Sequence, residues 1–481
     1  MIACRFAIFS RAAALLAALL CLAPAARAAR RCAEPHGRHG CFSRINAAIA
    51  ASSAGDIIQI LPGRYVENVV VDKALTLEGA AIDGDDDGDS DRDDGAVIYP
   101  AVSNPDCSPG SLCGGAASVI ILVRSDGVTI RGLTLNGDNP ALLSGVVRGG
   151  HDIDARIGII TDHLNGAFTG LTVEHVEVRN VYTRGMQMST GGTFSFRYNQ
   201  ISNVQGDGLA IALFNSGGQG VMEHNVVDHA NDALSANHSR GTRFAGNVVT
   251  HSQSGVHTDN AGDGGGSTPD LIEDNRISDC EPASNPSATA LWSFVSYLGP
   301  VFRNNTSRGC TVGLGVYGIG VAAGAPTFSG NRVLGSGAAG TVGALVTTAD
   351  LGFGTFDATA QFSGNHIERF ETGLLVHQDA GRTGKASATS LCLRRNGTGV
   401  ATQGPGTASV HQSAFSDSAR FGADATAGGP IDATSSFWGA KSGPRPPGAG
   451  DAIAGAVTAN PFLTALPTGL ACPGGHEHDD D

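Results

Sequence analysis

A short apolar pattern around an asparagine recurs along most of the chain. In each copy an apolar residue lies three positions before the asparagine, and in most copies a β-branched residue lies two positions after it. After Asn365, for example, come a short polar turn, a glycine and an alternating apolar strand. Such segments are too short and too β-branched for amphipathic helices, so they predict strands. The asparagines are Asn199, Asn225, Asn247, Asn275, Asn305, Asn331, Asn365 and Asn396.

The asparagines recur every 22 to 34 residues, which is the period of a repeat architecture. A single unit of this length cannot bury its apolar face alone, whereas stacked coils of short strands share one continuous core. An asparagine at the same corner of successive coils can form a ladder of side-chain hydrogen bonds inside the stack. The pattern therefore predicts an all-β solenoid of roughly a dozen coils.

The segment before the repeats predicts a cap and a first coil. Ser43 is expected to N-cap a helix that covers the end of the solenoid and stops at Gly55. Three strands are then expected at Ile57–Leu61, Val69–Val71 and Leu75–Leu77, with sharp corners between them. Three strands within about twenty residues correspond to one triangular coil.

Two further segments carry a family resemblance. Ile58–Asn68 resembles the opening coil of right-handed parallel β-helix proteins of the pectin-lyase-like class, and the asparagine coils resemble their repeats. Phe437–Gly439, followed by Gly443–Pro444 and Asn460–Phe462, resembles the segment that closes many of them. The resemblance implies a right-handed parallel β-helix. It implies no single activity, because the class contains lyases, hydrolases, esterases, epimerases and proteins without enzymatic function.

The ends of the chain predict export. Two arginines, the apolar run Ala12–Ala23 and the small residues Ala26 and Ala28 are typical of a secretory signal peptide. We expect this signal over 1–28, the N-terminal cap over 29–55, the β-helix over 56–438, and a closing segment with a polar tail over 439–481. No later apolar run reaches the roughly 18 residues of a transmembrane helix. The protein is expected to be secreted or periplasmic, and monomeric.

Ten cysteines fit an oxidising compartment. Two of them lie in the signal, which leaves an even number in the mature chain. The expected disulfides are Cys32–Cys41, Cys107–Cys113, Cys280–Cys310 and Cys392–Cys472. The first two pairs follow from closeness in sequence, and other pairings of the last four cysteines stay open.

An acidic segment dominates the net charge of −14. Residues 83–94 contain eight aspartates, and their spacing, with a glycine at the sixth position, follows that of a calcium-binding loop. We predict a structural calcium ion in an acidic loop at 83–95; the alternative is a solvated loop without a metal. The predicted ligands are Asp83, Asp85, Asp87, Asp89, Asp91 and Asp94. No basic stripe points to nucleic acid as a partner.

Alignment of the coils on the residue before the last strand predicts a candidate active site. Polar residues of neighbouring coils, about 4.8 Å apart, would form one solvent-facing stripe. Two carboxylates at about this spacing suit a retaining glycosidase, and with calcium, an arginine or a histidine they suit a lyase or epimerase. The alternative is that aspartate before glycine is ordinary turn chemistry. The stripe consists of Arg184, Asp207, Asp232, His257 and Asp259.

Two functions remain open on these grounds. The first is binding or processing of an extracellular polysaccharide, as a polysaccharide lyase, glycoside hydrolase or epimerase. The second is a non-catalytic surface, adhesion or structural role. Aromatic residues are only 6% of the chain, which provides few platforms for sugar stacking. A group of histidines near the same coils is interpreted as surface residues rather than as a metal site: His224, His229, His238 and His251.

Overall fold

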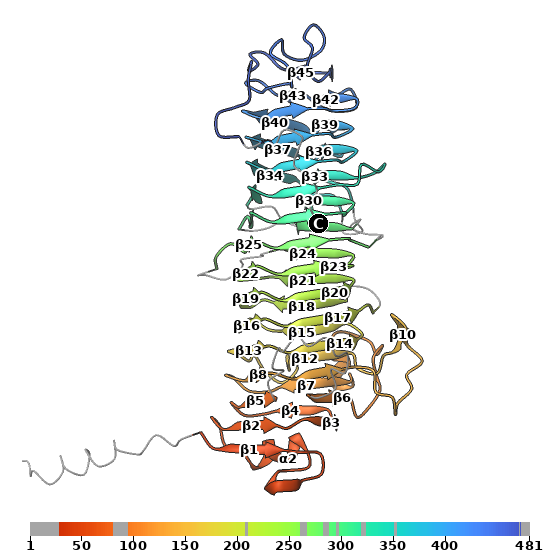
Figure 1. Ribbon diagram of the computed structural model, residues 1–481, viewed down its shortest axis with the longest axis vertical. Helices are drawn as coiled ribbons and strands as arrows, with labels where there is room; N and C mark the ends of the chain where they lie inside the picture. The colour runs from red at the N-terminus through yellow and green to blue at the C-terminus, as the bar shows by residue number, and fades with distance from the viewer. Residues whose placement is uncertain are drawn as a thin grey trace, which may run out of the picture.

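The computed structural model describes residues 28–79, 95–206, 210–259, 267–281, 288–294, 298–318, 324–350, 354–470 and 472. The chain winds into a long stack of coils built from short strands and corners (Figure 1). Strands of successive coils pair in parallel and form three sheets that run along the stack. This arrangement confirms the predicted all-β parallel β-helix. The expected signal peptide and the predicted calcium ligands lie outside the described residues, so both stay predictions.

Within the described residues, each coil contributes in turn to the three sheets. The first sheet contains β1 (Arg30–Ala33), β2 (Ile57–Ile60), β5 (Thr76–Gly79), β8 (Thr129–Arg131), β13 (Leu171–Glu174), β16 (Thr193–Arg197), β19 (Gln219–Glu223), β22 (Thr242–Ala245), β25 (Leu271–Glu273), β28 (Val301–Arg303), β31 (Thr327–Ser329), β34 (Ala358–Ser363), β37 (Gly384–Thr389), β40 (Thr407–His411), β43 (Ile431–Asp432) and β45 (Val457–Thr458). The second sheet contains β3 (Gly63–Val66), β6 (Ala96–Tyr99), β9 (Thr134–Asn136), β14 (Glu177–Val181), β17 (Gln200–Val204), β20 (Val226–Ala230), β23 (Val248–Thr250), β26 (Arg276–Ser278), β29 (Thr306–Arg308), β32 (Arg332–Leu334), β35 (His366–Glu368), β38 (Cys392–Arg394) and β41 (Ala414–Ser416). The third sheet contains β4 (Val69–Val71), β7 (Val119–Val123), β12 (Ile157–Thr161), β15 (Arg184–Met188), β18 (Ile211–Ser216), β21 (Asp232–Asn237), β24 (Ser254–Thr258), β27 (Thr289–Phe294), β30 (Val312–Tyr317), β33 (Val342–Thr347), β36 (Thr372–His377), β39 (Thr398–Gln403), β42 (Phe421–Ala425) and β44 (Ile453–Gly455). An antiparallel hairpin, β10 (Val147–Arg148) and β11 (His151–Asp152), projects from the side of the stack.

One apolar core runs through the stack. The residue predicted three positions before each asparagine points inward, and its side chain lies on the equivalent residue of the next coil. Rings of Phe302, Phe328 and Phe362 stack with centroids 4.6 and 5.1 Å apart. The full row, in register on the first sheet, is Phe196, Met222, Phe244, Ile272, Phe302, Phe328 and Phe362.

A ladder of buried asparagines holds the corner between the first and second sheets. The Nδ2 of each asparagine donates to the Oδ1 of the asparagine one coil further on, at 2.8–2.9 Å from Asn199 to Asn365. These side chains are at most 1% exposed. The ladder predicted from the repeat is thus confirmed for its first seven members, Asn199, Asn225, Asn247, Asn275, Asn305, Asn331 and Asn365.

Asn396 does not continue the ladder, although the sequence pattern placed it there. The register sets Leu393 opposite Ile367 on the second sheet, not opposite Phe362 on the first. Asn396 therefore lies at a later corner, where its Oδ1 accepts from the backbone of Phe370 at 3.0 Å. A leucine three residues before an asparagine can occur at the corner after the first sheet or at the corner after the second, so the sequence pattern did not distinguish the two corners.

The N-terminal end is covered by a short helix, α2 (Ile45–Ala51), as predicted. Its N-cap residue is Arg44 rather than the expected Ser43, and no capping side chain from the adjacent turn bonds to it. Instead the buried carboxylate of Glu67 accepts from the backbone of Ile45 at 2.8 Å and of Asn46 at 3.1 Å. A carboxylate from the first coil thus satisfies the free N–H groups of the helix.

All four expected disulfides form. They link Cys32–Cys41 in the cap, Cys107–Cys113 in the loop before β7, Cys280–Cys310 between neighbouring coils, and Cys392–Cys472 at the closing end. In the described part of the chain, no helix has the length and apolar character needed to cross a membrane.

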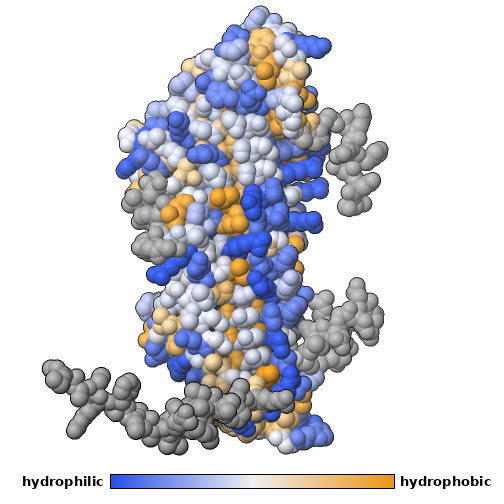
Figure 2. All heavy atoms as spheres, turned by 90° about the vertical axis from the view of Figure 1, so that its left-hand side faces the viewer, coloured by the Kyte–Doolittle hydropathy of each residue, from blue (hydrophilic) through white to orange (hydrophobic). Residues whose placement is uncertain are grey.

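Arginines and glutamates alternate across the outer face of the first sheet. Glu223 contacts Arg197 and Arg243, and Glu273 contacts Arg243 and Arg303. Figure 2 views the molecule from this side and shows hydrophilic side chains along much of its length. Each charge faces an opposite charge from the next coil, so this side is a paired, solvated surface whose ion pairs add little stability individually.

The ladder predicts a large loss of stability on Asn275→Ala. The change removes the acceptor of Asn247 Nδ2, 2.8 Å away, and the donor to the carbonyl of Phe244, 3.0 Å away. Because each buried unsatisfied group costs about 1–3 kcal/mol, we expect the free energy of unfolding in urea to fall by about 3 kcal/mol. Asn165→Ala, which removes an exposed asparagine bonded to Asp162, should cost less than about 1 kcal/mol. Equal losses in the two variants would contradict this role of the ladder.

Candidate functional site

A buried row of polar and aromatic side chains crosses the outer face of the third sheet. The register pairs Gln187 with Phe214, Phe214 with Ser235, Ser235 with His257 and His257 with Trp292. Outward residues of a solenoid usually meet solvent, yet these five are at most 7% exposed. Polar groups buried on such a face need hydrogen-bond partners.

Ser235, His257 and Asp232 form a linked chain within this row. Ser235 Oγ lies 2.6 Å from His257 Nε2, and His257 Nδ1 lies against Asp232 Oδ2. Asp232 and Ser235 belong to β21, whereas His257 comes from β24 of the next coil. Coil stacking therefore brings a hydroxyl, an imidazole and a carboxylate together in the order nucleophile, base and orienting acid.

Arg184 places a positive charge near this chain. Its guanidinium lies over the ring of Phe214, 4.9 Å from the centroid, and its Nη1 donates to the carbonyl of Thr183 at 2.8 Å. Burial lowers the pKa of Arg184 to about 10, and the negative charge of Asp232 opposes this shift. Arg184 remains a cation at neutral pH, and Asp232 is its main counter-charge.

Aromatic rings enclose the imidazole on the following coils. The ring centroid of Trp292 lies 4.5 Å from that of His257, and Phe294 and Tyr317 pack against Trp292 at 4.7 and 5.5 Å. Trp292 Nε1 donates to Ser254 Oγ at 2.6 Å. Burial raises the pKa of Tyr317 to about 12, so its hydroxyl stays protonated. The cluster is thus an apolar and aromatic enclosure around one polar chain.

The structure brings only part of the predicted stripe together. Asp232, His257 and Arg184 are close, but the first two are buried rather than solvent-facing as expected. Their catalytic role stays a prediction. Ser235 was not among the predicted site residues, because a serine on the outer face of a strand resembles an ordinary surface residue until its contact with His257 is seen.

Asp207 was aligned with Arg184 by an incorrect register. The structure sets Ile211 opposite Arg184 and Leu213 opposite Met186, whereas the sequence alignment placed Leu209 opposite Met186. Asp207 itself lies outside the described residues. Residues 209–214 are apolar without interruption, so the alternation of side chains does not fix which of them faces the core.

The structure groups Asp259 with Asp270, a buried acid. The backbone of His238 donates to Asp259 Oδ1, and the negative charge of Asp259 acts on the nearby carboxyl group of Asp270. Burial raises the pKa of Asp270 to about 7, with a further contribution from Asp259, while hydrogen bonds from the hydroxyls of Thr258 and Ser239 and the backbone of Thr242 oppose the shift. These bonds tie neighbouring coils together at the end of the third sheet.

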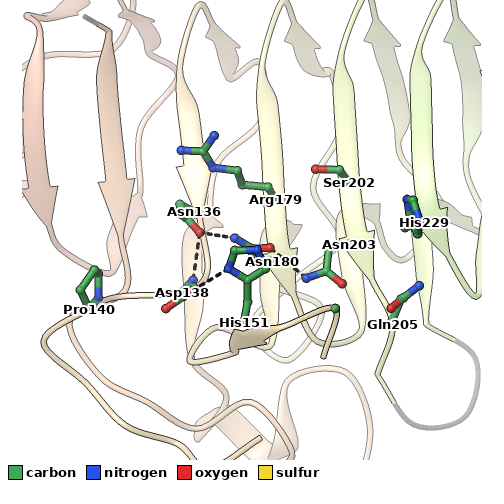
Figure 3. Close-up of a pocket in the computed structure, with 11 residues that line it drawn as sticks. Asn136, Asp138, Pro140, His151, Arg179, Asn180, Ser202, Asn203, Gln205 and His229 are labelled. Atoms are coloured by element: carbon green, nitrogen blue, oxygen red, sulfur yellow. Dashed lines mark hydrogen bonds and ion pairs between the residues drawn. The ribbon is translucent and has the colours of Figure 1, made fainter. Parts of the chain in front are cut away.

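A second candidate site is an open groove on the second sheet (Figure 3). It has a volume of about 510 Å³. Its floor comes from β9, β14, β17 and β20, and the β10–β11 hairpin supplies one wall. Hydrogen-bonding side chains from successive coils line it: Asn136, Asp138, His151, Arg179, Asn180, Ser202, Asn203, Gln205 and His229.

Three asparagines form a short ladder along the groove. Asn180 Nδ2 donates to Asn136 Oδ1, and Asn203 Nδ2 donates to Asn180 Oδ1, each at 2.9 Å. On the hairpin side, His151 Nδ1 lies 2.9 Å from Asp138 Oδ2. Asn180 and Asn203 have φ of 58° and 53°, a left-handed backbone that asparagine adopts readily. The ladder fixes the side chains at regular intervals along the coil axis.

The sequence pattern did not identify the groove. Asn136 and Asn180 belong to adjacent coils, but the hairpin segment between them obscures the repeat. An asparagine at a strand end also resembles an ordinary turn residue. The spacing of Asn180 and Asn203, one coil apart, was the only signal of this row.

Comparison with known proteins supports the fold. Residues 158–350 match the family model described as a right handed beta helix region. This match and the three parallel sheets show that the chain has the right-handed β-helix fold. No curated protein matches its sequence.

Several solved structures resemble this β-helix protein. The DFA-IIIase of Arthrobacter chlorophenolicus A6 in complex with GF2 is 14% identical, with 91% of this chain and 97% of that chain covered and a TM-score of 0.40. The catalytic domain of a GH87 alpha-1,3-glucanase with nigerose is 12% identical, with 79% and 66% covered and a TM-score of 0.45. PfbA, a surface adhesin of Streptococcus pneumoniae, is 12% identical, with 77% and 87% covered and a TM-score of 0.42. Similarity at this level assigns no activity to this chain.

The buried contacts of Asp232 with His257 and Arg184 predict that Asp232→Ala is strongly destabilising. The change leaves His257 without its carboxylate and Arg184 without its main counter-charge. Removal of one partner of a buried ion pair costs about 3 kcal/mol or more, which chemical unfolding would measure. The matched control is Asp432→Ala, since Asp432 lies 3.7 Å from His411 but is 52% exposed. That variant should lose less than about 1 kcal/mol. A loss in Asp232→Ala no larger than in the control would contradict the buried pairing.

Proposed function

We propose that this β-helix protein binds an extracellular polysaccharide along the groove of the second sheet. The observation that carries the proposal is the row of hydrogen-bonding side chains that repeats from coil to coil in an open groove of about 510 Å³. Sugar hydroxyls both donate and accept hydrogen bonds, and amide side chains offer both functions. A groove lined by amides, an arginine and histidines therefore suits a hydroxyl-rich ligand.

The repeat of the groove supports a polymer rather than a small molecule. Successive coils lie about 4.8 Å apart, close to the length of one sugar residue, so the groove side chains of successive coils can meet equivalent hydroxyls of consecutive sugars. The groove crosses four coils, from β9 to β20. The amide ladder also holds Asn180 and Asn203 in place before a ligand arrives, which lowers the entropic cost of binding.

Export is part of this proposal. Four disulfides support an oxidising compartment, since such bonds are rare in the cytosol of most organisms. The charged start, apolar run and small residues of the first 28 positions support a signal peptide. A polysaccharide outside the cell is a substrate or ligand that an exported protein would meet.

The groove predicts that Arg179→Ala weakens polysaccharide binding. Arg179 lines the groove and also contacts Glu177 at 3.2 Å. Loss of a charged hydrogen-bond donor should raise Kd about 10-fold, as measured by calorimetry on the glycan that binds best from a panel of neutral and acidic polysaccharides. The control is Arg308→Ala on β29, an exposed arginine of the same sheet several coils away, which should bind as wild type does. A wild-type Kd in Arg179→Ala would contradict the location of the site.

A second candidate function is hydrolysis of an acyl ester at Ser235. The observation in its favour is the linked chain of Ser235, His257 and Asp232. Ser235 Oγ would attack the ester carbonyl carbon while His257 Nε2 accepts the hydroxyl proton, and the alcohol would leave with that proton. Water, deprotonated by His257, would then release the acid and restore the serine. Since Ser235 is fully buried, the reaction requires a conformation in which its hydroxyl reaches the substrate.

This second function predicts that Ser235→Ala abolishes ester hydrolysis. Wild type should hydrolyse 4-nitrophenyl acetate or release acetate from an acetylated polysaccharide, and the variant should be slower by about 1000-fold because its nucleophile is gone. Ser307→Ala provides a control with another buried serine, on β29, and should keep wild-type activity. If wild type releases no acetate, or if Ser235→Ala keeps its activity, the second function is wrong.

A further inference from the structure

Two histidines of adjacent coils are stacked at the edge of the groove. His229 follows Asp228 near the end of β20, and His251 lies one coil further on, after β23. Both have a left-handed backbone, with φ of 54° and 44°. Their ring centroids are 5.0 Å apart. They occupy the corner that Asn180 and Asn203 occupy in earlier coils, so stacking aligns their imidazoles along the axis of the solenoid.

One carboxylate links the two imidazoles. Asp228 Oδ2 lies 2.7 Å from His229 Nδ1, and Asp228 Oδ1 lies 2.8 Å from His251 Nδ1. Thr250 donates its hydroxyl to the same Asp228 Oδ1 at 2.7 Å, which holds the carboxylate in orientation. One ligand atom from each of the three residues lies within 4.8 Å of the others, and within the described residues this is the one group of metal-ligating side chains that meets so closely.

The donor set matches the preferences of zinc and related ions. Two imidazole nitrogens and one carboxylate oxygen are common protein ligands of divalent transition metals. Metal–nitrogen distances are about 2.0–2.1 Å, and the three ligand atoms lie within 4.8 Å of one another, so small rotations of the side chains would bring them to coordination distance. The three side chains are 38–51% exposed and can rotate by this amount without disturbing the core.

Neighbouring side chains support the three ligands. Glu281 Oε1 lies 3.8 Å from His229 Nε2, on the coil that follows His251, so it can help to orient the imidazole whose Nδ1 faces Asp228. The bonded hydroxyl of Thr250 supplies the outer support that metal-binding carboxylates usually have. Asp228, His229 and His251, from two adjacent coils, thus offer three ligand atoms at one point of the surface.

We propose that Asp228, His229 and His251 bind a divalent transition metal ion of the zinc class, with water completing its coordination. Binding would replace the two hydrogen bonds between the imidazoles and Asp228 with bonds to the ion. Because His229 also lines the groove, the ion would lie at the end of the row of amides. The site goes beyond the proposed function, since metal binding does not require that a polysaccharide binds.

Isothermal titration of the full chain with Zn²⁺, after treatment with EDTA, tests the proposal. We expect saturable binding of one ion at this site, and His251→Ala should weaken that binding by about 100-fold or more, because a direct ligand is lost. The matched control is His224→Ala, whose ring stacks on Tyr198 at 5.1 Å rather than on a second histidine. This control should bind zinc as wild type does.

The C-terminal tail needs its own control, because it also contains histidines and acids. The double variant His476→Ala/His478→Ala removes those imidazoles and should keep the zinc site of wild type. Zinc binding that disappears in the tail variant, or that is unchanged in His251→Ala, would overturn the proposal, as would a wild type that binds no zinc. These readouts contain no polysaccharide, so a failed groove and a failed metal site give separate results.

Discussion

Hydrogen bonding between coils is the constraint on which the rest of this molecule depends. Parallel strands satisfy their backbone only if each coil lies in register on the next, and the buried asparagine ladder fixes that register at one corner. An asparagine inside a core is unfavourable unless both ends of its amide are bonded. From Asn199 to Asn365 the stack meets this condition, because each side chain bonds a neighbouring asparagine of the ladder and a backbone carbonyl.

The same register determines which side chains become neighbours at the candidate sites. Residues far apart in sequence become neighbours when they occupy one position in successive coils, as Ser235 and His257 do on the third sheet and Asn180 and Asn203 do on the second. The two faces differ in access. The polar side chains of the third sheet are buried, with Ser235 fully enclosed, whereas the second sheet lines an open groove in which Asn136, Arg179 and Asn203 are partly exposed. Binding is therefore assigned to the groove in our proposal, and chemistry at Ser235 is the second candidate.

The architecture could be predicted from the sequence because the same pattern recurs in many coils. The asparagine and the apolar residue three positions earlier predicted the ladder and the inward row of Phe302 and Phe328. The candidate site was harder to predict, because it depends on register within single coils. An uninterrupted apolar run around Ile211 concealed the correct pairing with Arg184. One wall of the groove is a hairpin that belongs to no repeat, so no periodic signal indicated that wall.

Hydrogen–deuterium exchange with and without a bound oligosaccharide tests the central claim most directly. If the polysaccharide lies in the groove, amide exchange should slow in segments 136–151, 179–182 and 202–205, which line it, and should stay unchanged on the first sheet. Slowing confined to the first sheet, or to the third-sheet segments around Asp232 and His257, would contradict the account and move the binding site to another face of the solenoid.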